Sequence, residues 1–316
     1  MLNKKSKIFV AGHNGMVGSA ILRKLKDLKF KKIFFRSKKQ LDLMNQKKVY
    51  DYIKKIKPNA VILAAAKVGG IKANNEKRAE FIFNNLAIQN NVIDSSFKNG
   101  VKNLIFLGSS CVYPKNSKIP IKENYLLSNY LEKTNEPYAI AKIAGINLCE
   151  SYNFQYGVNY KCLMPCNAYG INDNYDPHTS HFFPALIRKI INALKTKKDY
   201  IEIWGSGKPF RELIFSDDIA DACIHFLKKK TKHTLINIGT GNEMSINSYA
   251  KYIMRHLGVN LKIIHRDIKF DGTYRKLIDS SLARKYGWKY KTKLDVGLSI
   301  TINDYLKRLV IMNRKK

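Results

Sequence analysis

The feature that most constrains the fold is a regular alternation of short apolar runs with segments of helical periodicity. Residues 7–12 (KIFVAG) form an apolar run of strand length, and glycines at positions 12, 15 and 18 then lead into a helical pattern. The same order returns several times, as far as residues 159–165 (NYKCLMP). Such alternation is typical of a parallel sheet with helices on both faces. We therefore expect an α/β fold with a doubly wound parallel sheet of the Rossmann type.

Beyond about residue 169 the pattern becomes irregular. Loop-like stretches such as 171–181 (INDNYDPHTSH) stand between helical pieces, and 235–241 (LINIGTG) predicts a strand that returns to the main sheet. We expect a dinucleotide-binding Rossmann domain over residues 1–169. Residues 170–316 are expected to form mainly a smaller α/β substrate-binding domain, with a segment near 212–245 returning to the first.

Charge and apolar runs restrict the partners. The chain has 57 Lys and Arg against 24 Asp and Glu, a formal net charge of +33. This charge permits nucleic-acid binding, but the lysines are spread along the whole chain, so we expect no nucleic-acid partner. A basic surface still attracts small polyanions such as nucleotides. No stretch approaches the roughly 18 uninterrupted apolar residues of a membrane span, so we expect no membrane partner.

Cysteines and the N-terminus indicate the compartment. The five cysteines are an odd set without CxxC spacing, which favours reduced thiols and neither a disulfide framework nor a metal site. The basic start, MLNKKSKIFVAG, ends at once in a glycine turn and lacks the apolar region of a secretion signal. We expect the cytoplasm.

The glycine turn predicts a cofactor site. After a strand and before a helix, backbone N–H groups and the helix dipole can face a pyrophosphate, and missing side chains allow its close approach. The alternative is a turn with a structural role alone. Dinucleotide contacts are assigned to Gly12, His13, Asn14, Gly15, Met16, Val17 and Gly18.

The segment after the second strand indicates which dinucleotide binds. Sites that prefer NAD usually have an acid there, whereas this chain has Arg36, Ser37, Lys38 and Lys39. Cations suit a 2′-phosphate, which favours NADP(H). The alternative is two more surface lysines among many. Asp42 and Leu43, just beyond, are also assigned to the cofactor.

A tyrosine and a lysine predict the chemistry. In residues 135–145 (NEPYAIAKIAG), Tyr138 and Lys142 are four apart and share one helix face. The ammonium would bring the pKa of the phenol closer to the working range. Ser109, in FLGSSCVYP at the end of a predicted strand, could bind the oxygen of a carbonyl being reduced. The alternative is an amphipathic helix with Tyr138 at the core edge and Lys142 reaching water.

Together, Gly-x-x-Gly-x-x-Gly, Ser109, Tyr138 and Lys142 resemble the extended short-chain dehydrogenase/reductase family. Within it, five blocks are similar to the GDP-L-fucose synthases, and the similarity covers essentially the whole chain. These blocks are AAAKVGGI, FLGSSCVYPK, EKTNEPYAIAKIAG, WGSGKPFRE and DGTYRKLID. The resemblance implies an NADPH-dependent 3,5-epimerase-4-reductase acting on a GDP-4-keto-6-deoxy sugar. It also implies a homodimer formed by the helix containing Tyr138 and the preceding helix from about Phe81.

The resemblance also assigns roles residue by residue. It implies Tyr138 as proton donor to O4, Lys142 as its partner and ribose ligand, Ser109 as carbonyl hydrogen-bond donor, and Cys111 and His181 as the epimerisation pair. Taken alone, Cys111 would be a packed small hydrophobe and His181 a loop hydrogen-bonder. Further cofactor contacts are implied for Leu107, Gly108, Ser109, Ser110, Lys142, Pro165, Cys166, Asn167, Ala168 and His181. Substrate contacts are implied for Asn167, Lys189, Trp204, Arg211, Asp271 and Lys276.

Departures from the family pattern leave alternatives open. Asn14 stands where arginine is frequent, Tyr274 where proline is usual, and Cys166 and Ala168 where threonine and leucine are common. The smaller Ala168 could admit a bulkier sugar, so one alternative is a GDP-4-keto-heptose C4 reductase that acts after a separate epimerase. A 4,6-dehydratase or 4-epimerase on the same fold is a second, but no acid follows Ser109. A non-catalytic dinucleotide-sensing or nucleic-acid-binding protein is a third, and the intact Ser109, Tyr138 and Lys142 argue against it.

Overall fold

The computed structural model describes residues 2–266 and 272–313. In this part of the chain the main sheet has the order β2-β1-β3-β4-β5-β9, and each neighbouring pair is parallel. Its strands are β1 (Lys7–Ala11), β2 (Lys32–Phe34), β3 (Ala60–Leu63), β4 (Asn103–Leu107), β5 (Asn159–Pro165) and β9 (Leu235–Ile238). The expected parallel sheet is confirmed, and so is the return of residues 235–238 to it.

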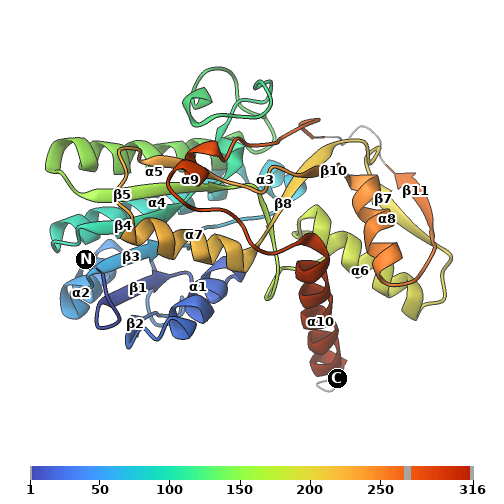
Figure 1. Ribbon diagram of the computed structural model, residues 1–316, viewed down its shortest axis with the longest axis horizontal. Coiled ribbons are helices and arrows are strands. Elements are labelled where there is room, and N and C mark those ends of the chain that lie inside the picture. Colours follow the sequence, from blue (N-terminus) through green and yellow to red (C-terminus); the bar gives the residue numbers. More distant parts are fainter. Residues whose placement is uncertain (1, 267–271, 314–316) are drawn as a thin grey trace.

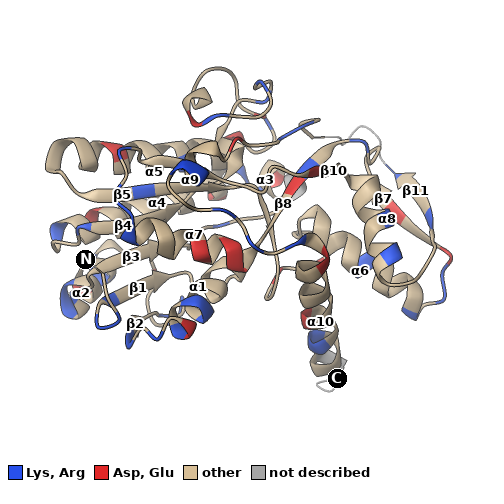
Figure 2. Ribbon diagram, viewed as in Figure 1, with Lys and Arg blue, Asp and Glu red and all other residues tan. Residues whose placement is uncertain are grey.

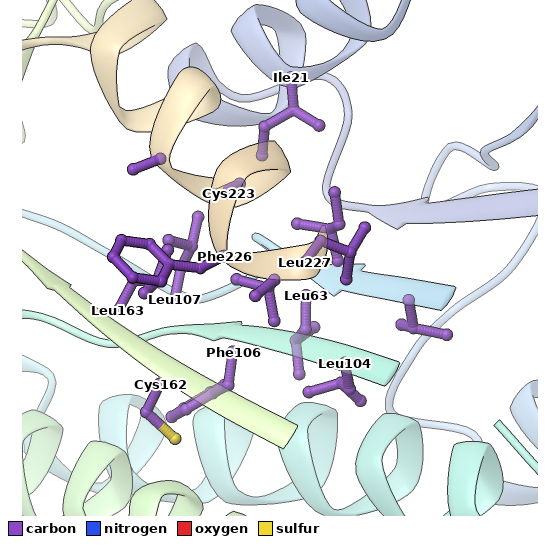
Figure 3. Close-up of a cluster of buried hydrophobic side chains, with 14 of the residues drawn as sticks. Ile21, Leu63, Leu104, Phe106, Leu107, Cys162, Leu163, Cys223, Phe226 and Leu227 are labelled. Atoms are coloured by element: carbon purple, nitrogen blue, oxygen red, sulfur yellow. The ribbon is translucent and has the colours of Figure 1, made fainter. Parts of the chain in front are cut away.

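Helices cover both faces of this sheet (Figure 1). α4 and α5 pack against each other on one face, and α1 and α7 pack against each other on the other. Figure 3 shows Phe226 and Leu227 of α7 on the side of α1, while Phe106 and Cys162 lie toward the opposite helices. The helices in this part of the fold are α1 (Met16–Asp27), α2 (Gln46–Ile56), α3 (Ile71–Glu76), α4 (Arg78–Lys98), α5 (Glu136–Tyr156) and α7 (Ser216–Lys228). The doubly wound arrangement is confirmed.

Local sequence explains these elements. β3 and β9 are buried along their whole length, as expected for apolar runs covered on both faces. α1 turns an apolar stripe inward, with Ile21 and Leu25 fully buried. α2 begins where the side chain of Asn45 accepts a hydrogen bond from the N–H of Lys48. α5 ends at Gly157, whose φ of 64° is the left-handed conformation that glycine adopts readily.

A second group of elements lies beside the main sheet. It has its own buried cluster, which includes residues of α6, α8 and α10. In the main cluster, Ile278 and Trp288 join the residues of the parallel sheet. The additional elements are β6 (Asn167–Tyr169), α6 (Phe182–Lys195), β7 (Tyr200–Trp204), β8 (Phe210–Phe215), β10 (Glu243–Ser245), α8 (Ile246–His256), β11 (Lys262–Arg266) and α10 (Leu294–Asn313). The short helix α9 (Ser281–Lys285) packs instead against β9 of the main sheet. β6, β8 and β10 form one small sheet, and β7 and β11 another.

The strand order locates the functional edge of the sheet. The chain passes from β1 to β2 on one side and later to β3 on the other, so the order reverses at β1. Ligands of doubly wound sheets bind beyond the carboxyl ends of the strands at such a reversal. The glycine turn follows β1 at this point.

Other surface properties are less localised. Lys and Arg are spread over both groups of elements (Figure 2). Among the described residues, none of the helices has the length and apolar character needed to cross a membrane. Within the same ranges, no group of three or more His, Cys, Asp or Glu side chains is placed to hold a metal ion.

Candidate active site

The glycine turn has the geometry of a phosphate cradle. Gly12 has φ of 93°, and a Cβ there would meet the backbone nitrogen of Ala65 at 2.5 Å. A Cβ on Gly18 would meet the carbonyl oxygen of Gly12 at 2.0 Å, so both positions require glycine. At Gly15 the nearest atom would be that same oxygen, at an ordinary 3.6 Å. The tight turn thus requires glycine at positions 12 and 18, while Gly15 leaves room for an approaching group.

The cationic segment after β2 lies close to this turn. The rings of His13 and Phe35 are 4.7 Å apart between centroids. The guanidinium of Arg36 lies 5.1 Å from the ring centroid of Tyr52, and its Nη1 donates to the Phe35 carbonyl at 2.8 Å. Ser37 N–H donates to the side chain of Gln40, and Lys38 is exposed. Leu43 is held because its carbonyl accepts from Asn91, and Asp42 accepts from the N–H of Met44.

Ser109, Tyr138 and Lys142 meet at the carboxyl end of β4. Ser109 follows the strand and precedes the short helix Ser110–Val112, and its Oγ accepts from the N–H of Cys111 at 3.3 Å. Tyr138 and Lys142 lie in the first two turns of α5, with the Nζ of Lys142 5.9 Å from the Tyr138 ring centroid. Nζ donates to the carbonyl of Leu107 at 2.9 Å. The spacing that the sequence suggested therefore forms one cluster.

Burial dominates the acid-base properties of this cluster. Tyr138 and Lys142 are 9% and 3% exposed. Burial raises the pKa of Tyr138, the charge of a Cys111 thiolate acts in the same direction, and a hydrogen bond with Ser109 opposes them. Burial also lowers the pKa of Lys142 to about 7. The expectation that the pKa of Tyr138 lies closer to the working range is wrong for this structure, because desolvation of the phenolate is the largest effect on it.

Cys111 is a direct neighbour of the tyrosine. It packs against the small apolar cluster of Ala73, Phe81 and Tyr138. The Phe81 and Tyr138 rings meet edge to face at 6.3 Å between centroids. The side-chain Nδ2 of Asn135 donates to the sulfur of Cys111 at 3.4 Å. A thiol, a phenol and a serine hydroxyl are thus brought together around one point.

His181 lies on the adjoining segment. It precedes α6 as the N-cap residue, and its carbonyl accepts from the N–H of Ala185. The loop just before it is fixed because Gly70 N–H donates to the Thr179 carbonyl at 3.1 Å. The stretch that begins at Gly70 leads into α3 and then to Phe81, beside Tyr138. His181 as a whole residue is exposed, while the protein packed around its ring lowers the pKa of the imidazole by desolvation.

The carboxyl end of β5 completes the edge of the sheet. Pro165 ends the strand, and Cys166 N–H donates to the carbonyl of Ile238 in β9 at 3.1 Å. Asn167 uses its side-chain Nδ2 to bind the carbonyl of Glu212 at 2.9 Å. Ala168 is partly buried against the main cluster.

Several residues assigned to the substrate contact one another or neighbouring segments. The Nζ of Lys189 lies 5.2 Å from the Trp204 ring centroid and donates to the Glu202 carbonyl at 2.8 Å. Trp204 is 54% exposed, so a flat group could stack on it. The Nη1 of Arg211 donates to the carbonyl of Thr273 at 2.8 Å, which ties β8 to the segment containing Lys276. Asp271 lies outside the described residues.

Sequence reasoning missed Asn135. It is the first residue of the stretch NEPYAIAKIAG, and its side chain contacts Cys111 while its Oδ1 is buried without a hydrogen-bond partner. Its position directly before α5 is a signal for a helix cap, yet its side chain makes no capping hydrogen bond. Only the contact with Cys111 distinguishes it from an ordinary cap.

Comparisons with known proteins agree with this geometry. The profile of the NAD dependent epimerase/dehydratase family matches residues 8–239. Putative GDP-L-fucose synthase 2 of Arabidopsis thaliana is 48% identical over 310 residues, covering 98% of this chain and 94% of that protein. GDP-L-fucose synthase of Escherichia coli (strain K12) is 43% identical over 311 residues, 96% of this chain and 97% of that protein.

A solved structure extends the comparison. A GDP-mannoheptose C4 reductase from Campylobacter jejuni, solved with NADP bound, has a TM-score of 0.89 and 38% identity, covering 97% of this chain and 100% of that one. The sequence and the whole fold are thus both similar to enzymes that are named for GDP-sugars. This chain belongs to the NAD dependent epimerase/dehydratase family.

Proposed function

We propose that the protein is an NADPH-dependent oxidoreductase that reduces the C4 carbonyl of a GDP-4-keto-6-deoxy sugar and first inverts C3 and C5. The product is GDP-L-fucose or a related GDP-sugar. The observation that supports it most strongly is the contact of Cys111 with Tyr138 beside Ser109, because it joins a potential C–H base to a potential carbonyl donor pair.

The residues present fit a dinucleotide. The glycine turn would hold its pyrophosphate, since the missing side chains at Gly12 and Gly18 allow the tight turn and Gly15 leaves room for the phosphate. Arg36 and Lys38 would bind a 2′-phosphate, and Lys142 the ribose of the nicotinamide half. When bound, NADPH supplies the hydride that is added to C4 of the sugar.

In the reduction, Tyr138 would act as the proton donor. Its raised pKa keeps the phenol protonated at neutral pH, so a proton is available when negative charge develops on O4. Ser109 would donate a hydrogen bond to the same oxygen and hold the ketone in place. The phenolate left behind takes its next proton from solvent, and Lys142 can stabilise it during that interval.

In the epimerisation, Cys111 would remove a proton from carbon and His181 would return one from the other face. The C4 ketone acidifies the hydrogens on C3 and C5, because the enolate charge moves onto O4, where Ser109 and Tyr138 donate. Breaking the C–H bond converts a Cys111 thiolate to the thiol, and forming the new C–H bond takes a proton from the imidazolium form of His181, which leaves neutral imidazole. After each turnover the two groups exchange protons with solvent.

The nucleotide would bind to the second group of elements. We propose that Trp204 stacks on the guanine and that Lys189, Arg211 and Lys276 neutralise the diphosphate. Asn167 would contact the sugar from the end of β5. The support is the exposed indole beside an ammonium.

A second candidate is C4 reduction of a GDP-4-keto-heptose already epimerised by another enzyme. Ala168 favours it, because alanine leaves more room next to the sugar than a leucine would. The similar solved structure from Campylobacter jejuni is that of a GDP-mannoheptose C4 reductase. The two candidates differ in whether C3 and C5 exchange their hydrogens.

Solvent isotope exchange tests the proposal. The protein is incubated in heavy water with the unepimerised GDP-4-keto-6-deoxymannose and NADP⁺, which cannot deliver hydride. We expect deuterium at C3 and C5 by mass spectrometry and NMR, and its loss in Cys111→Ser. No exchange, together with rapid NADPH oxidation on an epimerised heptose substrate, would favour the second candidate. No NADPH oxidation with either substrate would contradict both.

Domain division and location are further proposals. We infer a dinucleotide-binding domain over 1–169 and mainly a substrate-binding domain over 170–316, with a segment near 212–245 in the first. The two separate buried clusters support this division, and limited proteolysis would test it. A cytoplasmic location stays a prediction, and cell fractionation would test it.

A further inference from the structure

The side chain of a residue outside the parallel sheet forms a hydrogen bond with the glycine turn. The Nδ2 of Asn172 donates a hydrogen bond to the carbonyl oxygen of Asn14 at 2.6 Å. Asn14 lies in the turn between β1 and α1, and Asn172 lies just beyond β6. The contact therefore joins the predicted pyrophosphate turn to the part of the chain assigned to the substrate.

This hydrogen bond acts on a single peptide plane. The Asn14 carbonyl and the Gly15 N–H belong to one planar trans unit and point in opposite directions. The Gly15 N–H donates to the Gly12 carbonyl at 3.2 Å, so the turn holds one edge of the plane and Asn172 holds the other. α1 begins at the next residue, and its first N–H groups have no partner within the helix. The direction in which these N–H groups point toward a phosphate depends on the orientation of the peptide plane between Asn14 and Gly15.

Asn172 is itself fixed by α10. Its N–H donates to Oδ2 of Asp304 at 3.0 Å, and its Oδ1 accepts from Nη2 of Arg308 at 2.7 Å. Arg308 and Asp304 form an ion pair at 3.0 Å, and Nη1 of Arg308 donates to the Asp173 carbonyl at 3.0 Å. The backbone of Asn172 has φ of 68°, a left-handed conformation that asparagine adopts more readily than most residues. Such a side chain is oriented before any ligand arrives.

We propose that Asn172 is a positioning residue of the dinucleotide site, through which α10 sets the geometry of the pyrophosphate turn. The proposal rests on the dinucleotide function proposed above. Asp304 and Arg308 lie far along the chain from the glycine turn. The proposal gives their ion pair an indirect role in cofactor affinity. A link with only a structural role would stabilise the fold without changing the affinity of the turn for pyrophosphate.

The first test replaces Asn172 with glycine, which keeps the left-handed backbone and removes only the side chain. We expect the Kd for NADPH, measured by fluorescence titration, to rise about five- to tenfold, the effect of one net hydrogen bond. The Kd of adenosine 2′,5′-bisphosphate, which has no pyrophosphate, should change much less. Asn303→Ala, an exposed asparagine on the same helix, is the matched control and should bind NADPH as the wild type does.

The second test asks whether α10 acts through Asn172. Arg308→Met should weaken NADPH binding in the wild-type background and have almost no further effect in Asn172→Gly, because the two residues act in series. Full additivity, or wild-type NADPH affinity in Asn172→Gly, would overturn the proposal.

Hydrogen exchange separates this proposal from the proposed function. In the protein without nucleotide, the amides of residues 12–18 should exchange faster in Asn172→Gly than in the wild type. Unchanged exchange would overturn the proposed positioning role of Asn172 even if NADPH binds. Failure of the wild-type protein to bind NADPH in the first titration would instead refute the dinucleotide function.

Discussion

At the scale of single residues, burial decides what Lys142 can do. Its Nζ lies 4.5 Å from the ring centroid of Phe106 and donates to the Leu107 carbonyl at 2.9 Å. These contacts satisfy one N–H, and Lys142 forms no ion pair with a carboxylate within the described part of the chain. Desolvation therefore lowers its pKa to about 7. Lys142 can change its charge near neutral pH, which a surface lysine does not.

Lys142 makes stability depend on pH. Between pH 7 and its ordinary pKa of 10.5, the unfolded chain holds a proton that the folded protein has released, so the free energy of unfolding rises with pH. Lys142→Met lacks this contribution. From pH 7 to 9, the wild type should gain about 2 kcal/mol relative to Lys142→Met in urea unfolding. Identical pH profiles would contradict the prediction, and exposed Lys26→Met serves as control.

Tyr138 should be required for reduction and dispensable for folding. Tyr138→Phe removes the hydroxyl but keeps the edge-to-face contact with Phe81. We expect kcat for C4 reduction to fall by about 10²- to 10⁴-fold, the range of general acid catalysis, with little change in the Kd for NADPH. Tyr152 lies farther along α5, and its hydroxyl donates a hydrogen bond to Asp94 of α4. Tyr152→Phe should remain active. Wild-type turnover in Tyr138→Phe would remove the tyrosine from the mechanism.

Asn135 should affect epimerisation more than reduction. Its amide donates to the Cys111 sulfur, which orients the thiol and stabilises negative charge on it. In Asn135→Ala we expect deuterium incorporation at C3 and C5 to slow about tenfold, as for one lost hydrogen bond to a charged group. Reduction of an epimerised substrate should keep its rate. Equal loss of both rates would indicate a general disturbance of the site instead.

At the scale of elements, the strand ends and the segments that follow them build the site. Ser109 follows β4, the glycine turn follows β1, and Arg36 follows β2. Parallel strands bring these positions to one edge of the sheet. The segment after β2 is also ordered by the stacking of Arg36 on Tyr52, so its cation is directed by a packed ring.

Cofactor preference should depend on that segment. Arg36→Ala removes the guanidinium proposed to bind the 2′-phosphate. We expect KM for NADPH to rise about ten- to a hundredfold, the worth of a charge-assisted hydrogen bond, while KM for NADH changes little. Lys31→Ala, an exposed cation before β2, is the control. Equal efficiency of the wild type with NADPH and NADH would contradict the assignment.

At the scale of the whole molecule, α4 and α5 each expose a phenylalanine side chain. Phe83 of α4 is 64% exposed and Phe154 of α5 is 96% exposed. Phe154 lies with Asn147, Glu150 and Ser151 around a shallow depression, at spacings that place them on one helix face. We infer from these two exposed aromatic side chains that α4 and α5 contact another protein chain.

We predict a homodimer in which α4 and α5 of two copies form a four-helix interface. Light scattering at micromolar concentration should give twice the chain mass of 36.3 kDa. Phe154→Glu should shift the protein toward monomer, because burying a carboxylate in the interface is unfavourable. Val296→Glu, on α10, should leave the dimer intact. A monomeric wild type would refute the interface.

The α/β class, the parallel strands and the glycine turn follow from local sequence alone. Each depends on local periodicity or on the sterics of one residue, as at Gly12, where no Cβ fits. The grouping of Ser109, Tyr138 and Lys142 was also predictable, because strand ends share one edge of the sheet. Their catalytic and binding roles, like those of the other assigned residues, stay predictions.

The burial of these residues, and the side chains that they pack against, depend on long-range packing. Helical spacing placed Tyr138 and Lys142 on one face, but packing on the sheet removed both from water and reversed the expected effect on the pKa of Tyr138. The contacts of Asn135 with Cys111, and of Asn172 with Asn14, join segments that no local pattern relates. Such pairs form because separately folded elements dock, and the docking geometry depends on the whole core.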